Sequence, residues 1–183
     1  MNHQEHKIII TGSMGAGKTT AIGQISDHPP LLTDVANTRR DQADKATTTA
    51  AFDFGEVDLG DGEVLRIYGT PGQERFDFMW PILARGALGI VFLLDLTRPD
   101  PVADLERYMS AFGNTLGQTP SVLALNKLED GAESPVPLFQ NYLEERELHW
   151  PVMPIDARER EQVLNLMEVV LSLNESALTA EES

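Results

Sequence analysis

The chain has 183 residues, of which 42% are hydrophobic and 23% charged, a balance that suits one globular domain with one core. Its formal net charge of −15 argues against a surface that binds nucleic acid phosphates, and the absence of cysteine excludes disulfides and thiol catalysis. No apolar run reaches the length of a membrane helix, and neither end carries a signal or lipidation motif. We therefore expect a cytoplasmic protein with no direct membrane anchor.

The first elements in chain order are a buried strand over residues 7–11 and a helix over residues 20–25, joined by a glycine-rich loop. Residues 31–49 are then polar and without apolar periodicity, which is typical of a functional or disordered loop. Residues 52–68 predict a β-hairpin that turns at Gly60-Asp61-Gly62.

The second half of the chain alternates helices with short, continuously apolar strands. The helices are expected over residues 77–86, 100–117, 138–146 and 159–173, and the strands over 88–95, 122–125 and 151–155. This alternation predicts an α/β fold with a six-stranded, mostly parallel sheet, helices on both faces and one antiparallel hairpin strand. Ligands bind at the carboxyl ends of the strands in such folds. One domain is expected over residues 1–173, with a frayed tail over 174–183.

The loop between the first strand and the first helix has the spacing of a phosphate-binding loop, because Gly12 to Thr19 reads G-x-x-x-x-G-K-[ST]. The alternative is a glycine-rich turn that matches by chance, but the flanking strand and helix favour a P-loop NTPase. In such a loop the backbone N–H groups surround phosphate oxygens, Lys18 reaches the outer phosphates and the Thr19 hydroxyl ligates Mg²⁺. The nucleotide-binding residues expected here are Ser13, Met14, Gly15, Ala16, Gly17, Lys18, Thr19 and Thr20.

Four further segments complete a set that resembles the Ras-like small GTPases over nearly the whole chain. They are Thr49 to Phe54, Gly69 to Phe76, Asn126 to Glu129, and Asp156 to Arg158. Within that superfamily, the chain looks most like the prokaryotic branch related to the gliding-motility GTPases, which often work beside Roadblock-type proteins. The resemblance implies GTP and GDP as ligands, Mg²⁺ as cofactor and a regulatory or effector protein as partner.

The resemblance also implies roles for the two switch segments. In the first switch the Thr49 hydroxyl would ligate Mg²⁺, with Thr48 as the fallback; a threonine-rich approach to an edge strand is the alternative reading. In the second switch the Gly72 N–H would bind the γ-phosphate, and Gln73 would orient the attacking water. Gln73 and Lys18 are thus the expected catalytic residues.

The remaining two segments would read the base. The resemblance implies that Asn126 ties its loop to the phosphate loop, that Lys127 lies along the base plane and that Glu129 faces the guanine edge. In the last segment, which holds Asp156, Ala157 and Arg158, the alanine N–H would face the guanine oxygen.

Three residues depart from the family pattern. Gly69 stands where an aspartate normally holds Mg²⁺ through water, so weaker metal affinity is expected. Glu129 stands where an aspartate accepts two guanine N–H groups; the loop adjusts, Asp130 substitutes, or base selectivity is relaxed. Met14 replaces a glycine of the best-known relatives and could crowd Gln73.

The sequence thus predicts a guanine-nucleotide switch that hydrolyses GTP slowly until a protein partner accelerates it. Arg39 or Arg40 could enter the site as an arginine finger, although a solvated pair in a loop is the simpler reading. One alternative is a GTPase-like scaffold that binds nucleotide with little or no hydrolysis. A P-loop ATPase or kinase fits less well, because the Pro-Gly-Gln-Glu-Arg-Phe string of residues 71–76 would be unexplained.

Overall fold

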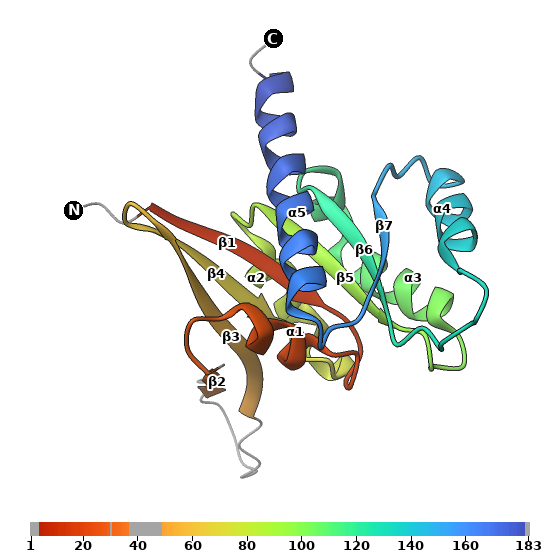
Figure 1. Cartoon of the computed structure of the whole chain (residues 1–183), viewed down its shortest axis with the longest axis horizontal. Coiled ribbons are helices and arrows are strands. Elements are labelled where there is room, and N and C mark those ends of the chain that lie inside the picture. Colours follow the sequence, from red (N-terminus) through yellow and green to blue (C-terminus); the bar gives the residue numbers. More distant parts are fainter. Residues whose placement is uncertain (1–3, 30, 37–48, 182–183) are drawn as a thin grey trace, which may run out of the picture.

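The computed structural model describes residues 4–29, 31–36 and 49–181, which form one sheet flanked by helices (Figure 1). The strand order is β2-β3-β4-β1-β5-β6-β7, and β3 runs antiparallel to both neighbours while every other pair is parallel. The strands are β1 (Gln4–Thr11), β2 (Leu31–Ala36), β3 (Thr49–Gly60), β4 (Glu63–Gly69), β5 (Gly89–Asp95), β6 (Ser121–Asn126) and β7 (Val152–Ile155).

The predicted α/β class, with a single antiparallel strand, is confirmed. The described sheet nevertheless has seven strands where six were expected, because Leu31–Ala36 pairs with Thr49–Phe54 of β3. This short segment carries only three large apolar residues and has no alternation of its own. Its strand conformation follows from the backbone ladder that β3 offers, which cannot be read from the segment alone.

The helices are α1 (Lys18–Ile25), α2 (Trp80–Ala84), α3 (Pro101–Phe112), α4 (Val136–Glu144) and α5 (Arg160–Glu181). Two predicted helices are partly 3₁₀: Glu74–Met79 precedes α2 and Gly113–Gly117 follows α3. The predicted domain end at residue 173, with a frayed tail over 174–183, does not coincide with the end of a helix. Instead α5 continues through Asn174 to Glu181.

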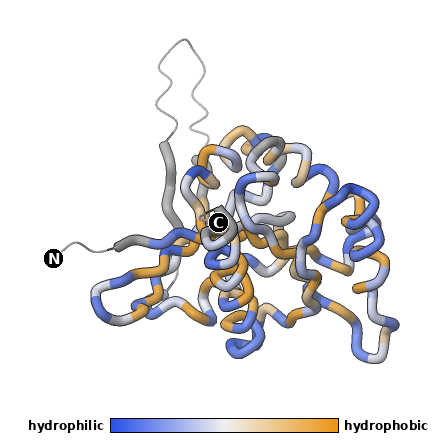
Figure 2. The backbone as a smooth tube through the Cα atoms, turned by 90° about the horizontal axis from the view of Figure 1, so that it is seen from above, coloured by the Kyte–Doolittle hydropathy of each residue, from blue (hydrophilic) through white to orange (hydrophobic). Residues whose placement is uncertain are grey.

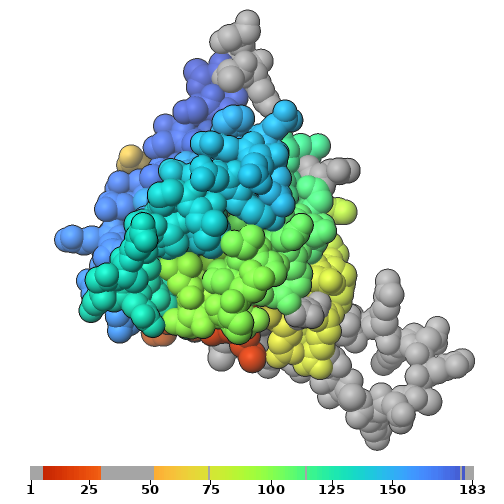
Figure 3. Space-filling model, turned by 90° about the vertical axis from the view of Figure 1, so that its right-hand side faces the viewer, coloured from red at the N-terminus to blue at the C-terminus, as the bar shows by residue number. Residues whose placement is uncertain are grey.

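The core lies in two layers because the inner strands are apolar on both faces. Ile8 and Ile10 of β1 pack with α1 and α5 on one face, whereas Ile9 packs with α2, α3 and α4 on the other. Apolar segments accordingly lie inside and the outermost turns are hydrophilic (Figure 2). The α4 side of the molecule forms one continuous surface with α3 (Figure 3). Among the described helices, none is both long and apolar enough to cross a bilayer.

Candidate nucleotide-binding site

The glycine-rich loop leaves the carboxyl end of β1 and caps α1. Gly17, the N-cap residue, has a φ of 108°, and a Cβ at this position would lie 2.5 Å from the amide nitrogen of Asn126. Only glycine fits both the left-handed backbone and the close approach. The N–H of Ala16 donates to the carbonyl of Ser13 at 3.1 Å, so the loop curls tightly before the helix begins.

Lys18 lies within this loop and is 6% exposed. Its Nζ donates to the carbonyl oxygens of Gly12 and Ser13 at 2.8 and 2.9 Å. Burial lowers the pKa of Lys18 to about 8, and the nearby charge of Asp53 opposes this shift. Bound phosphates would favour the charged ammonium, so this lysine is suited to hold an anion.

The Thr19 hydroxyl donates to Oδ2 of Asp53 at 2.7 Å. Asp53 lies on β3 and pairs with Gly69 of β4 in the antiparallel ladder. A Cβ at Gly69 would lie 3.1 Å from both Cβ and Oδ2 of Asp53. The carboxylate that the family pattern has at the position of Gly69, and that this chain lacks there, is therefore present one strand away, beside the hydroxyl expected to ligate Mg²⁺.

The start of the second switch is tied to the core. The Thr70 hydroxyl lies 2.9 Å from the Thr11 hydroxyl, and the backbone N–H of Thr70 donates to the carbonyl of Ile10 at 2.9 Å. The fully buried indole of Trp80 donates to the carbonyl of Pro71 at 3.0 Å. The loop is thus anchored as far as Pro71.

Beyond that anchor, the second switch lies against the phosphate loop. A Cβ at Gly72 would lie 2.5 Å from the backbone nitrogen of Met14, so the two loops meet backbone to backbone. Gln73 and Met14 line the same cavity, and the crowding of Gln73 by Met14 stays a prediction. The Met14 side chain is 71% exposed.

On the base side, one buried amide joins three segments. Asn126 donates from Nδ2 to the carbonyl of Ala16 at 2.8 Å, and its Oδ1 accepts the N–H of Ala157 at 3.1 Å. The predicted tie between Asn126 and the phosphate loop is confirmed. The Ala157 N–H, which the resemblance assigns to the guanine oxygen, points at Asn126 here.

Lys127 is anchored by a carboxylate from the end of β5. Its Nζ lies 2.6 Å from Oδ2 of Asp95, whose Oδ1 accepts the hydroxyl of Thr97 at 2.6 Å. Burial alone would raise the pKa of Asp95, but the hydrogen bonds from Lys127 and Thr97 outweigh it and lower that pKa. Lys127 has a positive φ of 63°, and it lines the base-side cavity.

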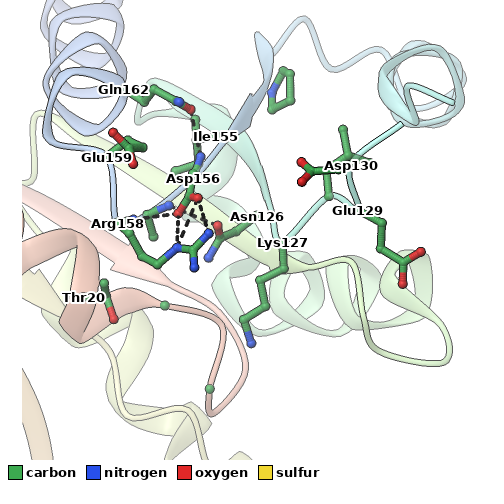
Figure 4. A pocket seen from close by; sticks show the side chains of 15 residues that line it. Thr20, Asn126, Lys127, Glu129, Asp130, Ile155, Asp156, Arg158, Glu159 and Gln162 are labelled. Atoms are coloured by element: carbon green, nitrogen blue, oxygen red, sulfur yellow. Dashed lines mark hydrogen bonds and ion pairs between the residues drawn. The ribbon is translucent and has the colours of Figure 1, made fainter. Parts of the chain in front are cut away.

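Arg158 and Asp156 form a closed ion pair at the edge of the base side (Figure 4). The guanidinium contacts both carboxylate oxygens, at 2.9 and 3.1 Å from Nε and 2.6 Å from Nη2. Hydrogen bonds from Arg158 lower the pKa of Asp156 to about 2. The side chain of Gln162 accepts the Asp156 N–H, which fixes this turn to α5.

Two cavities meet at Gly15 and together form the site. The larger, about 690 Å³, lies on the base side, and the smaller, about 240 Å³, lies between the phosphate loop and the second switch. Taken together, the two volumes lie within the roughly 300–1,000 Å³ that is usual for ligand pockets. The predicted residues that line one or both are Met14, Gly15, Gly17, Lys18, Thr19, Thr20, Gly72, Gln73, Asn126, Lys127, Glu129, Asp156, Ala157 and Arg158.

The structure describes little of the predicted first switch. Thr49 opens β3 opposite Ala36, and its side chain lies outside the described part of the chain. Thr48, Arg39 and Arg40 lie wholly outside the described residues.

Sequence reasoning missed the roles of Asp53 and Asp95, although one of them left a signal. Counting outward from the hairpin turn at Gly60-Asp61-Gly62 places Asp53 opposite Gly69, as observed. The described residues hold no group of three or more histidines, aspartates or glutamates that is placed to hold a metal ion. Any metal here would therefore depend on few protein ligands plus phosphate and water oxygens, which suits Mg²⁺.

Comparison with known proteins agrees with this geometry. A family described as "Conserved hypothetical ATP binding protein" matches residues 31–177. The Ras-related protein Rab-7b of Paramecium octaurelia is 34% identical over 140 residues, 73% of this chain and 63% of that protein. Mouse Ras-related protein Rab-12 is 29% identical over 125 residues, covering 67% of this chain and 47% of its own. The chain thus spans less than two thirds of these relatives.

The solved structures give the same fold. A variant of Era from Aquifex aeolicus, bound to GDP and AlF4⁻, superposes with a TM-score of 0.64 and 19% identity. The match covers 93% of this chain and 57% of the Era chain. The bond from Asn126 to the phosphate loop is the arrangement that the Ras-like resemblance implies. The chain therefore belongs to the family described as conserved hypothetical ATP binding proteins, and it is similar to Ras-related proteins over 73% of its length.

Proposed function

We propose that this protein is a Mg²⁺-dependent guanine-nucleotide switch that hydrolyses GTP to GDP slowly and is accelerated by a protein partner. The observation that carries the proposal is the meeting of two cavities at Gly15, one beside the phosphate loop and one beside the Asn126 loop. The first suits phosphates and the second suits a base. Asn126 bonds to Ala16 and holds the two at a fixed separation.

The residues present fit a magnesium ion. Mg²⁺ in phosphate sites keeps several waters and uses one or two protein groups plus phosphate oxygens. Thr19 and Asp53 supply a hydroxyl and a carboxylate 2.7 Å apart, beside the phosphate loop. Bound there, the ion would neutralise charge on the phosphate oxygens, and Thr49 would add a further ligand.

Hydrolysis would depend on positioning rather than on a covalent intermediate. Gln73 lines the phosphate-side cavity and would orient water, while the adjacent Gly72 N–H would bind the γ-phosphate. Lys18 would stabilise the outer phosphates. No arginine of the described residues lines this cavity, and Arg39 and Arg40 lie outside that part of the chain.

The partner would read the two switches, residues 31–49 and 69–80, as the γ-phosphate orders and releases them. We propose a Roadblock-type protein in this role, in line with the resemblance to the gliding-motility branch. Met14, Phe78 and Ile82 are large apolar side chains more than half exposed near the second switch, and they support a protein contact there.

The family description names ATP, whereas the Era structure holds GDP, so base choice is the first point to test. Nucleotide-free protein would be titrated calorimetrically with GDP, GTP, ADP and ATP, with and without Mg²⁺. We expect guanine nucleotides to bind more tightly and Mg²⁺ to strengthen that binding. Equal or tighter adenine binding would overturn the guanine assignment.

Single-turnover GTP hydrolysis, alone and with a Roadblock-type protein, tests the switch. We expect slow turnover alone and faster turnover with the partner. Tight binding without hydrolysis in either condition would instead identify a GTPase-like scaffold.

A further inference from the structure

The base-side cavity presents two successive carboxylates, Glu129 and Asp130, at its outer wall. The family pattern aligns Glu129 with the residue that reads guanine, one methylene longer than the usual aspartate. The surroundings of the two side chains differ, and this difference favours Asp130 over Glu129 as the residue that reads the base.

Glu129 lies on a ridge between two cavities. It lines the base-side cavity and also a separate one of about 420 Å³, which Leu138 and Phe139 of α4 line as well. In Figure 4 the Glu129 carboxylate points away from Asn126 and Asp156. Asp130 lines the base-side cavity but not the second one.

A tight turn sets these directions. The Ala132 N–H donates to the carbonyl of Glu129 at 3.1 Å, and Gly131 has a φ of 77°. This is the signature of a type II turn, in which Asp130 and Gly131 are the two central residues. The turn rotates Asp130 inward, and its carboxylate faces the side where Asp156 and Arg158 lie (Figure 4).

The charged groups nearby leave the Asp130 carboxylate available to accept hydrogen bonds from a ligand. Asp156 is engaged by Arg158 through both carboxylate oxygens. Hydrogen bonding by Asp156 raises the pKa of Arg158, and the charges of Glu159 and Asp130 add to this, so Asp130 is within electrostatic reach of the guanidinium. Among the described residues, none donates a hydrogen bond to the Asp130 carboxylate.

We propose that Asp130, and not Glu129, is the carboxylate that accepts the N1–H and N2–H groups of guanine. This rests on the proposed function, because it assigns base choice within the same site. An ionised carboxylate only accepts hydrogen bonds, so it matches the two donors of guanine. Adenine offers an acceptor at N1 and no amino group at C2. A site built to pair with such donors rejects analogues that lack them by factors of roughly 10⁴–10⁵.

The test uses Asp130→Asn, the rival substitution Glu129→Gln and the control Glu133→Gln in the full chain, each titrated with GDP, ADP and xanthosine diphosphate. Xanthine carries a carbonyl at C2, to which the amide of an asparagine donates. For Asp130→Asn we expect GDP affinity to fall roughly 10- to 100-fold and xanthosine diphosphate affinity to rise by a similar factor. Glu133→Gln, which removes a carboxylate outside the base-side cavity, should stay within about twofold of the unchanged protein for all three ligands, whereas Glu129→Gln should not gain affinity for xanthosine diphosphate.

The gained affinity for xanthosine diphosphate cannot arise from misfolding, so it separates base reading from structural damage. If Glu129→Gln makes the exchange and Asp130→Asn does not, Glu129 reads the base and the inference is wrong. If neither variant changes the preference of a protein that binds GDP tightly, the inference also fails while the proposed function stands. If the unchanged protein binds no guanine nucleotide, the proposed function itself fails.

Discussion

The hydroxyl of Thr19 and the carboxylate of Asp53 are joined at 2.7 Å, although they belong to α1 and β3 and lie 34 positions apart. The family pattern supplies the equivalent carboxylate from the second switch, where this chain has Gly69. Because β3 and β4 form one hairpin, a change of strand moves the carboxylate by only one step across the ladder. The expectation of weaker Mg²⁺ affinity considered Gly69 alone. The affinity therefore has to be measured with and without the carboxylate of Asp53.

Asp53→Asn should weaken Mg²⁺ binding to the nucleotide complex roughly 10- to 100-fold, as loss of a group that supports a metal ligand typically does. Asparagine keeps the shape and an acceptor for the Thr19 hydroxyl, so the loss reflects charge. Nucleotide release as a function of Mg²⁺ concentration gives the affinity, and Mn²⁺ resonance spectra report the ligand environment directly.

Asp58→Asn is the matched control, since Asp58 lies on the same strand and its carboxylate caps the hairpin turn by accepting the Gly60 N–H. It should leave Mg²⁺ affinity unchanged. Equal effects of the two substitutions would mean that general charge, and not the position of Asp53, sets the affinity.

The carboxylate can also be moved back to the position usual in the family. Gly69→Asp alone should destabilise the protein, because the new Cβ would lie 3.1 Å from Asp53 and from Cδ1 of Ile22. Combined with Asp53→Ala, which removes the carboxylate but keeps Cβ, the same substitution should recover part of the lost Mg²⁺ affinity. A double variant no better than Asp53→Ala would show that the β4 position cannot reach the ion.

Asn126→Ala should cost about 3 kcal/mol in the free energy of unfolding, because it leaves two buried backbone groups without partners. These are the carbonyl of Ala16 and the N–H of Ala157. Denaturant unfolding of nucleotide-free protein measures the loss. Asn141→Ala, at an exposed position on α4, is the control and should not destabilise. A small effect at Asn126 would mean that the loops hold their places without it.

The lowered pKa of Lys18, about 8, predicts a pH dependence with a definite sign. Between that value and its ordinary 10.5, the unfolded chain holds the proton more firmly than the folded one. The free energy of unfolding of nucleotide-free protein should therefore rise with pH across this window.

Nucleotide binding reverses the shift, because phosphates favour the ammonium. At about pH 9, binding in Mg²⁺-free buffer should take up about one proton, and at about pH 7 very little. Titrations in two buffers of different ionisation enthalpy measure the uptake. Lys18→Arg, which stays charged throughout this range, should abolish it. Uptake that does not change with pH would contradict the assignment to Lys18.

The fold and most of the residues that line the two cavities could be predicted, because both depend on patterns that run along the chain. The phosphate loop and the Asn126 segment are each contiguous, and their flanking strands have continuous apolar sequences. Strand β2 could not be found in this way, since its partner β3 supplies the reason for its conformation. The helix of α5 beyond Asn174 likewise gave little apolar signal.

The roles of Asp53 and Asp130 were harder to predict, because each role depends on an adjacent strand or turn. Asp53 was used only to fix the register of the first switch, although the hairpin turn already placed it opposite Gly69. Asp130 was one of three open possibilities, and only the direction of the turn at Gly131 separates it from Glu129. A residue's place in a motif was visible in the sequence, whereas its direction was not.

The bond from Trp80 to Pro71 limits how the second switch can rearrange. The indole is fully buried and packs 4.7 Å, centroid to centroid, from the ring of Tyr108, so the carbonyl of Pro71 is fastened to the core. Any displacement must then begin at Gly72, which makes that glycine the hinge. The chain has only one other tryptophan, Trp150, stacked on Phe92. With Trp150 replaced by phenylalanine, the fluorescence emission of the protein comes from Trp80 alone. A change in that emission during turnover would show that the hydrogen bond from Trp80 to Pro71 breaks, and a constant emission would show that movement is confined to Gly72 and the residues after it.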